Sequence, residues 1–173
     1  VNLLNNSNLF WLPKELILFN NCNLKRKINF NLSKDSNLLL CENIIFGRTS
    51  MKEEFEKGYF SDFWNINIDK KLIHTEAINT GLFEKKYLNS FSTLNNNSAV
   101  ATIIIVGNKF LNNVNNLSET LTNNENTTSN YSHWDNKLIV RLLSKDSYNL
   151  KFAIDKILSY FFEGSKIPKV WNI

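Results

Sequence analysis

The chain has 173 residues, of which 43% are hydrophobic and 21% charged, so it is long enough for one domain with a hydrophobic core and too apolar for intrinsic disorder. Its formal net charge of +4 is mild and its lysines are scattered, which argues against a nucleic-acid-binding protein. Two cysteines make no disulfide framework or zinc-ligand spacing, and no apolar run reaches the roughly 20 residues that a membrane span needs. Without a basic-then-apolar signal segment, we expect a cytoplasmic protein.

The first half of the chain carries patterns typical of β-strands. A strand is expected to open at Trp11-Leu12-Pro13, because proline suits a strand start or edge. Residues 23–32 form a second strand with apolar side chains on one face. Residues 63–69 alternate apolar and polar side chains and turn at Asp69-Lys70-Lys71 into a hairpin partner over residues 72–80.

The second half mixes strands with helices. The β-branched run 99–106 predicts a buried strand, and residues 137–143 predict another. Apolar spacing predicts a helix over 109–122, and the polar segment 123–136 is expected to be a loop. A second helix should follow Asp146 or Ser147 as N-cap, end before Gly164, and bury an apolar stripe formed by Leu150, Ile154, Ile157, Leu158 and Phe161.

This order of elements predicts a mainly β fold, a single domain over residues 1–173, with two layers of strands and two α-helices in the C-terminal half. The tail that contains Pro168 and Trp171 cannot continue the second helix.

The most informative segment is the strand expected over residues 38–46. Residues two apart share a face of a strand, so Glu42 points with the apolar side chains of Leu40 and Ile44. A carboxylate on an apolar face is costly unless it is paired, hydrated or metal-bound. Two interpretations stay open: a structural group satisfied by Arg48 or by backbone N–H groups, and a cation-handling position inside the protein. Gly47 should end the strand.

A second candidate lies on the hairpin strand over residues 72–80. By parity Leu72, His74, Glu76 and Ile78 share a face, which sets an imidazole beside a carboxylate. This ligand pair suits nickel or zinc, although two such groups are more often a surface pair. If this strand faces the Glu42 strand, both carboxylates and His74 would converge.

An enzyme is not expected. A nucleophile site would have to combine Cys41 with His74 or His133 and a carboxylate, but Cys41 has the opposite parity to Glu42 and no flanking nucleophile motif. A glycine-rich phosphate loop is also missing from the sequence.

Several segments, in order, resemble the urease accessory protein UreD (UreH) family. The segment that begins at Trp11 resembles the family's WLPQ…I.F segment. The apolar strand that contains Glu42, followed by Gly47-Arg48, resembles the family's apolar strand with an acidic residue and a Gly-Arg pair. The tail that ends at Trp171 is similar to the family's closing LPR.W. The residues that carry the resemblance are Trp11-Leu12-Pro13, Leu38–Glu42, Phe46-Gly47-Arg48, Met51, Glu53, Phe55, Gly58, Leu72–Glu76, the run 137–143 with Ser144, Asp146 and Leu150, and Ile167-Pro168-Lys169-Val170-Trp171. Lys52 replaces a glycine of the family pattern, and Phe63 stands where the family often has arginine.

The resemblance implies a mostly β scaffolding chaperone of urease maturation that catalyses nothing. Such proteins bind the urease apoprotein and UreF, which recruits UreG, and help to deliver nickel through a water-filled, partly acidic passage. Glu42 and Glu76 match acidic positions of the family and are the expected nickel-passage residues, with nickel as a transient cargo and no resident cofactor or fixed metal site.

The resemblance lacks a counterpart of the family's N-terminal third, so the chain is expected to be the C-terminal two-thirds of a UreD-like protein. The alternatives are a β-rich protein-binding module without a nickel role, and a thiol hydrolase that would need an unusually reactive Cys41.

Overall fold

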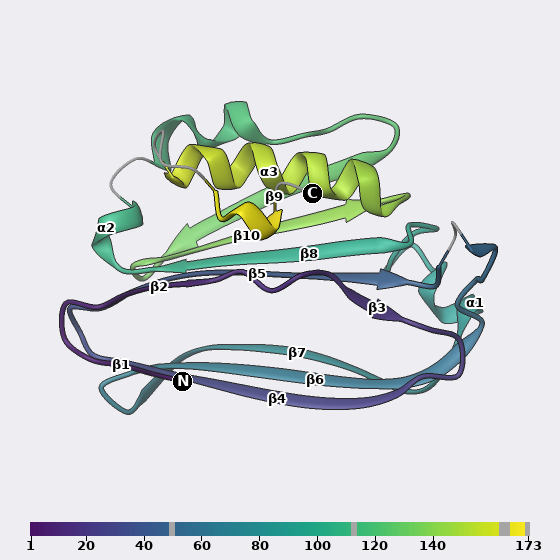
Figure 1. Cartoon of the computed structure of the whole chain (residues 1–173), viewed down its shortest axis with the longest axis horizontal. Helices are drawn as coiled ribbons and strands as arrows, with labels where there is room; N and C mark the ends of the chain where they lie inside the picture. The colour runs from purple at the N-terminus through teal and green to yellow at the C-terminus, as the bar shows by residue number, and fades with distance from the viewer. Residues whose placement is uncertain (49–50, 112–113, 163–166, 172–173) are drawn as a thin grey trace.

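Two β-sheets lie face to face in the computed structural model, and helices cover the outer face of one of them (Figure 1). The structure describes residues 1–48, 51–111, 114–162 and 167–171. The strands within these ranges are β1 Asn2–Leu3, β2 Asn8–Trp11, β3 Leu16–Leu18, β4 Asn23–Leu32, β5 Asn37–Phe46, β6 Lys57–Ile68, β7 Lys71–Glu84, β8 Ala99–Val106, β9 Thr127–Trp134 and β10 Lys137–Ser144. The helices are α1 Lys85–Leu88, α2 Asn108–Leu111 and α3 Ser147–Phe162, with 3₁₀ helices η2 Val114–Thr120 and η3 Lys169–Trp171.

The first six strands wind back and forth between the two sheets, with β2 and β3 following each other in the same sheet. The lower sheet in Figure 1 has the order β1-β4-β6-β7, and the upper sheet has the order β2-β5-β8-β10-β9 with β3 also paired to β5. The pairs β1–β4, β4–β6, β2–β5 and β3–β5 are parallel. Parallel strands need a crossover between them. Here the crossover runs through a strand of the opposite sheet, so the chain coils like a short β-solenoid before the antiparallel strands β7 to β10 complete both sheets.

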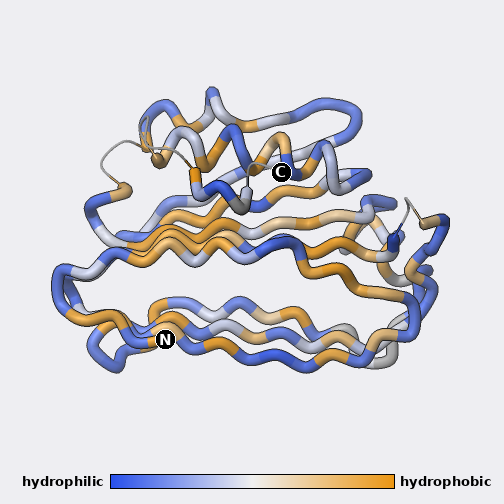
Figure 2. Tube along the Cα trace, in the orientation of Figure 1, coloured by the Kyte–Doolittle hydropathy of each residue, from blue (hydrophilic) through white to orange (hydrophobic). Residues whose placement is uncertain are grey.

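Burial on both faces explains why β5 is almost continuously apolar. Leu38, Leu40, Ile44 and Phe46 face the other sheet, while Leu39, Cys41 and Ile45 pack in the cluster that contains α3. Figure 2 shows this concentration of hydrophobic residues in the middle strands. The predicted parity of this strand is confirmed, and so is its end: Gly47 has φ 85°, and a Cβ there would lie 2.8 Å from the Glu53 carbonyl oxygen.

The predicted hairpin is confirmed, with longer strands and one irregularity. Asp69 and Lys70 both have positive φ, 46° and 69°, as a two-residue type I′ turn requires. Pairing then shifts from Asn67↔Leu72 to Ile66↔His74, which leaves Ile73 as a β-bulge. The bulge reverses the parity before His74. Our prediction that Leu72 shares the face of His74 is therefore wrong. Leu72 is 55% exposed, and Ile73 packs inward instead.

Three further predictions from the sequence are wrong. Trp11 ends β2 instead of opening a strand, and Pro13 lies in the break before β3, where its missing N–H disturbs no ladder. The helix expected over 109–122 is a turn of α-helix followed by η2, with residues 112 and 113 outside the described ranges. The loop expected over 123–136 contains β9, a polar edge strand paired to β10 alone.

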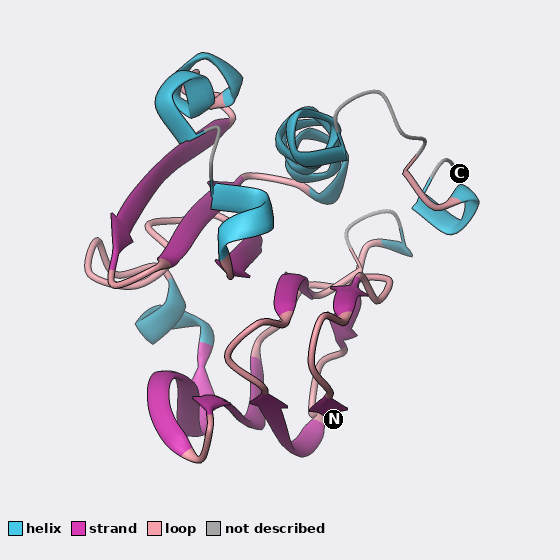
Figure 3. Ribbon diagram, turned by 90° about the vertical axis from the view of Figure 1, so that its left-hand side faces the viewer, coloured by secondary structure: helices cyan, strands magenta, loops and turns pink. Residues whose placement is uncertain are grey.

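The C-terminal helix follows its prediction closely. The Asn149 backbone N–H donates to Asp146 Oδ1 at 2.8 Å, which identifies Asp146 as the N-cap of α3. All five stripe residues are buried against the upper sheet, and Figure 3 shows α3 nearly end-on beside it. Gly164 lies outside the described residues. The tail forms η3, and its Trp171 Nε1 donates to the Leu12 carbonyl oxygen at 2.9 Å. Of the helices described, none combines the length and apolarity needed to cross a membrane.

Candidate functional site

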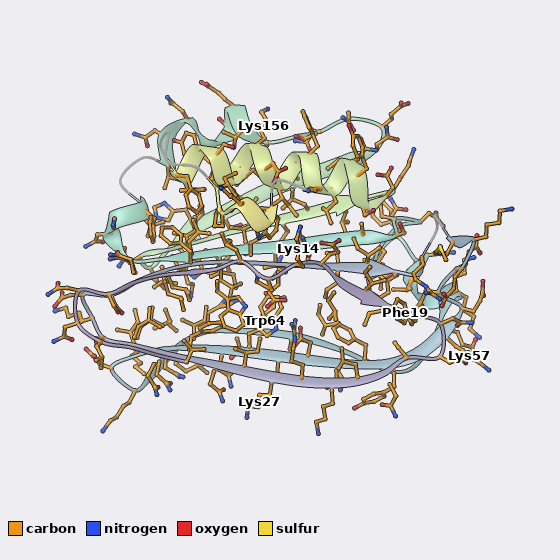
Figure 4. All side chains as sticks on the ribbon, viewed as in Figure 1. Lys14, Phe19, Lys27, Lys57, Trp64 and Lys156 are labelled. Atoms are coloured by element: carbon orange, nitrogen blue, oxygen red, sulfur yellow. The ribbon has the colours of Figure 1, made fainter. Side chains whose placement is uncertain are left out.

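A band of polar side chains divides the space between the two sheets. On the inter-sheet face of β5, Leu40 precedes Glu42 and belongs to a first hydrophobic cluster. Ile44 follows Glu42 and belongs to a second hydrophobic cluster. We call the groups between these clusters the polar band; its members are Trp11, Arg26, Glu42, Asp62, His74, Glu76, Thr102 and Arg141. Figure 4 places Trp64, which belongs to the first hydrophobic cluster, in this inter-sheet space.

Glu42 is fixed by two donors from other strands. Trp11 Nε1 donates to Glu42 Oε1 at 2.8 Å, and Arg26 Nη2 donates to Glu42 Oε2 at 2.9 Å. Arg26 also forms a two-pronged contact with Asp62, from Nε to Oδ1 at 2.9 Å and from Nη2 to Oδ2 at 2.7 Å. The side chains of Glu42 and Asp62 are each 1% exposed, and that of Arg26 is 25% exposed. We call these three residues the Arg26 cluster.

Arg48, expected as the partner of Glu42, lies elsewhere. Its Nε donates to Glu53 Oε2 at 2.6 Å, in a partly exposed pair beyond the end of β5. The reason is the turn at Gly47, which takes Arg48 away from the inter-sheet face on which Glu42 lies. A salt bridge does satisfy Glu42, but through a residue 16 positions upstream in the sequence.

The Arg26 cluster sets two carboxyl groups against one guanidinium. Burial alone lowers the pKa of Arg26, but its hydrogen bond to Asp62 and the charges of Glu42 and Asp62 outweigh burial and raise the pKa above its ordinary value. The guanidinium is thus fully charged at neutral pH. That one guanidinium serves two carboxyl groups that are almost completely shielded from water.

A second, smaller group lies around Glu76 on β7. Arg141 binds both carboxylate oxygens, from Nη1 to Oε1 at 2.9 Å and from Nη2 to Oε2 at 2.7 Å. His74 Nε2 lies 3.5 Å from Glu76 Oε2, which confirms that these two side chains are neighbours. Burial raises the pKa of Glu76, but the nearby His74 and the two hydrogen bonds and charge of Arg141 prevail, so that the pKa lies below its ordinary value. Glu76 is therefore ionised at neutral pH.

The two glutamates share the polar band without converging on one point. Glu42 is the register partner of Thr102 on β8, and Thr102 is the partner of Arg141 on β10. Arg141 Nη1 also donates to Thr102 Oγ1 at 3.3 Å. Within the described ranges no three His, Cys, Asp or Glu residues are grouped closely enough to hold a metal ion. The arrangement is two arginine-paired acid groups in one band.

Glu42 lies beside a gap in the upper sheet. The parallel partner of β5 is β2 as far as Leu40 and is β3 from Ile44 onward, so the pairing skips Cys41, Glu42 and Asn43. The connection that contains Pro13 spans this gap. On its far side Lys14, Asn43 and Lys151 line a pocket of about 300 Å³ against α3. At Glu42 the edge of β5 therefore has no paired strand on this side.

The cysteine nucleophile considered from the sequence is not assembled. Cys41 is fully buried under α3, on the face of β5 opposite to Glu42, and burial raises the pKa of its thiol far above the ordinary value. His74 lies on the inter-sheet side, and His133 is exposed on β9. A thiol without access and without a base beside it cannot act as a nucleophile at neutral pH.

Sequence reasoning missed Arg26, Asp62, Thr102 and Arg141. A signal was present for two of them: Arg26 shares parity with Leu24 and Ile28, and Asp62 shares parity with Trp64, so both had to point inward if their strands were half-buried. The pairing of these residues with Glu42 was not readable, because it depends on which strands face each other.

Comparison with known proteins gives one consistent family. The family model described as "UreD urease accessory protein" matches residues 1–172. A protein of Rhizobium leguminosarum bv. viciae named "Urease accessory protein UreD" is 32% identical over 166 residues, covering 94% of this chain and 59% of the relative. A protein with the same name from Agrobacterium fabrum is 30% identical over 169 residues, covering 95% of this chain and 57% of the relative. Another from Granulibacter bethesdensis is 41% identical over 97 residues, covering 56% of this chain and 40% of the relative. The chain thus spans about six-tenths, or less, of the length of these relatives.

Proposed function

Because the chain belongs to the UreD urease accessory protein family, we propose that it acts as a non-catalytic chaperone in the maturation of urease. In this proposal it binds the urease apoprotein and UreF in the cytoplasm, with UreG recruited through UreF. The chain helps to deliver nickel to the urease active site, and nickel is a cargo that passes and leaves.

One observation carries the nickel part of the proposal: Glu42 and Glu76 are buried carboxylates in a polar band between two hydrophobic clusters. Carboxylate oxygens are harder ligands than the imidazole and thiolate groups that hold nickel tightly. Successive weak oxygen ligands would let an ion enter and leave, whereas a closed site of histidines and cysteines would trap it.

A second candidate function is a β-rich protein-binding module without a nickel role. The observation that favours it is the pairing of each glutamate with an arginine, because a neutralised carboxylate can be purely structural. The two proposals agree on the protein partners and differ only in whether the acids contribute to nickel delivery.

The experiment uses the chain joined to the part of the Rhizobium leguminosarum relative outside the match, co-expressed with urease subunits, UreF and UreG. We expect co-purification with UreF and the urease subunits, and failure to associate would defeat the chaperone proposal. Glu42→Gln and Glu76→Gln are then compared with the parent for urease activation at limiting nickel. Unchanged activation with intact association would favour the binding module.

A further inference from the structure

Every buried carboxylate of the polar band is held by a guanidinium, and this pattern bears on how a metal ion could use the band. We infer that Glu42 and Asp62 form a latent divalent-cation site that the side chain of Arg26 occupies in the resting protein. Nickel, the cargo of the proposed function on which this inference rests, would bind these carboxylates only after the guanidinium withdraws.

The geometry of the Arg26 cluster supports a shared site. A single nitrogen, Arg26 Nη2, contacts both Glu42 Oε2 at 2.9 Å and Asp62 Oδ2 at 2.7 Å. Two carboxylates that reach the same nitrogen lie close enough for one cation to bridge them if that nitrogen leaves. Both side chains are 1% exposed, so the cation would be screened from water, and its attraction to the carboxylates would be correspondingly strong.

The charges explain why Arg26 must move first. A divalent ion that approached the occupied cluster would face the guanidinium at close range in a region of low dielectric constant, where like charges repel strongly. If Arg26 withdrew, the site would hold two carboxylates and no opposing cation. The tethered guanidinium is therefore a competitor for the same oxygens and would keep the dwell time of a metal ion short.

Two features make withdrawal of Arg26 feasible. Its side chain is one-quarter exposed, and in the described pairing β1 covers β4 only at Asn31 and Leu32, so Arg26 lies on an uncovered stretch of the strand edge. The guanidinium carbon also lies 5.9 Å from the centre of the Trp64 ring. Trp64 Nε1 is buried without a hydrogen-bond partner in the part of the chain that the structure describes, so an unused donor lies near the Arg26 cluster.

The test measures Ni²⁺ binding to the purified protein by equilibrium dialysis at fixed pH, with no urease present. Arg26→Met should bind Ni²⁺ about tenfold or more tightly than the parent, because it removes the competing charge and keeps an apolar stem. Arg26→Lys keeps a competing charge and should show no such gain. Arg48→Met is the matched control, because it removes a guanidinium from the partly exposed pair with Glu53.

The gain must depend on the two carboxylates. Adding Glu42→Gln and Asp62→Asn to Arg26→Met should abolish it. The inference is overturned if Arg26→Met folds and binds Ni²⁺ no more tightly than the parent, or if the gain survives loss of both carboxylates.

Arg26→Met leaves two unpaired buried carboxylates, so its fold is checked by circular dichroism with and without Ni²⁺. If the variant is unfolded, the inference still predicts that Ni²⁺ restores the fold, because a bound cation stabilises the state that binds it. No restoration would overturn the inference. Since the readout does not involve urease, this outcome is separable from a failure of the protein to support urease maturation.

Discussion

At the scale of single residues, the polar band is a set of charges whose states depend on their neighbours. Glu76 is the clearest case, because the nearby His74 and the two hydrogen bonds and charge of Arg141 hold its pKa below the ordinary value despite burial. A carboxyl group whose pKa is lowered by folding stabilises the folded state above its unfolded pKa of about 4.3, and this stabilisation disappears as the pH falls through the folded pKa.

Glu76→Gln should therefore lower the melting temperature at pH 7 and should cost progressively less as the pH falls below about 4. The measurement is a series of thermal melts of the parent and the variant between pH 7 and pH 3. Other acidic groups titrate in both proteins and cancel in the difference. A difference in melting temperature that stays constant over this range would contradict the assignment of a lowered pKa.

Trp11 combines ring packing against Phe30 with one polar contact at its indole nitrogen. Its Nε1 donates to a glutamate whose side chain is 1% exposed, and hydrogen bonds to charged groups contribute about 1.5–3 kcal/mol. Trp11→Phe should lower the free energy of unfolding by about that amount in urea denaturation. Trp134→Phe, on the exposed strand β9, is the control and should have a much smaller effect. Equal effects would mean that ring packing, and not the hydrogen bond, explains the loss.

At the scale of elements, the sequence predicted the bounds of those strands whose hydrophobic pattern lies within the segment itself. β4 and β8 have the predicted bounds, because their alternation and β-branched run are intrinsic to the segments. β9 was missed because an edge strand with polar side chains carries no hydrophobic period. Its one signal is Asp135-Asn136, a two-residue turn with both φ values positive that joins it to β10.

The site was only half readable for the same reason. Glu42 could be identified as inward-facing from its own strand, and Glu76 could be read only as a neighbour of His74. Arg26 and Asp62 are 36 residues apart and meet because β4 and β6 are neighbours in a parallel pair. The bulge at Ile73 shows the limit even within one strand: it preserves the His74–Glu76 face and reverses Leu72.

The N-terminus of α3 gives a prediction at this scale. Asp146 accepts the Asn149 backbone N–H, and loss of such a cap costs about 1 kcal/mol. Asp146→Ala should reduce the free energy of unfolding by about that amount, measured in urea, while Asp146→Asn should be nearly neutral because asparagine caps equally well. A large loss in Asp146→Asn would show that the charge, rather than the cap, is what matters.

At the scale of the whole molecule, two sheets enclose a polar band, although a hydrophobic core can form without buried charges. Replacing a buried ionic group with apolar side chains of similar volume is often neutral or stabilising, by about 1–4 kcal/mol. Arg26, Glu42 and Asp62, which lie between two hydrophobic clusters, therefore give the fold no advantage in stability. Their retention indicates that the charges serve another purpose.

The combined variant Trp11→Phe, Arg26→Met, Glu42→Met and Asp62→Leu separates stability from function. It removes both carboxylates, the guanidinium and the donor that would otherwise lose its acceptor, so no charge or donor of the Arg26 cluster is left unpaired. We expect a free energy of unfolding equal to the parent's or higher by about 1–4 kcal/mol in urea denaturation.

The same variant should keep its association with UreF and lose activation of urease at limiting nickel, because the changes lie mostly between the sheets and the Arg26 cluster can no longer bind a cation. If it activates urease as well as the parent does, the charges of the Arg26 cluster are dispensable for delivery, and the protein-binding module becomes the better account. If its stability instead falls by several kcal/mol, the ion pairs are structural, and the retention of charge between the sheets needs no explanation from function.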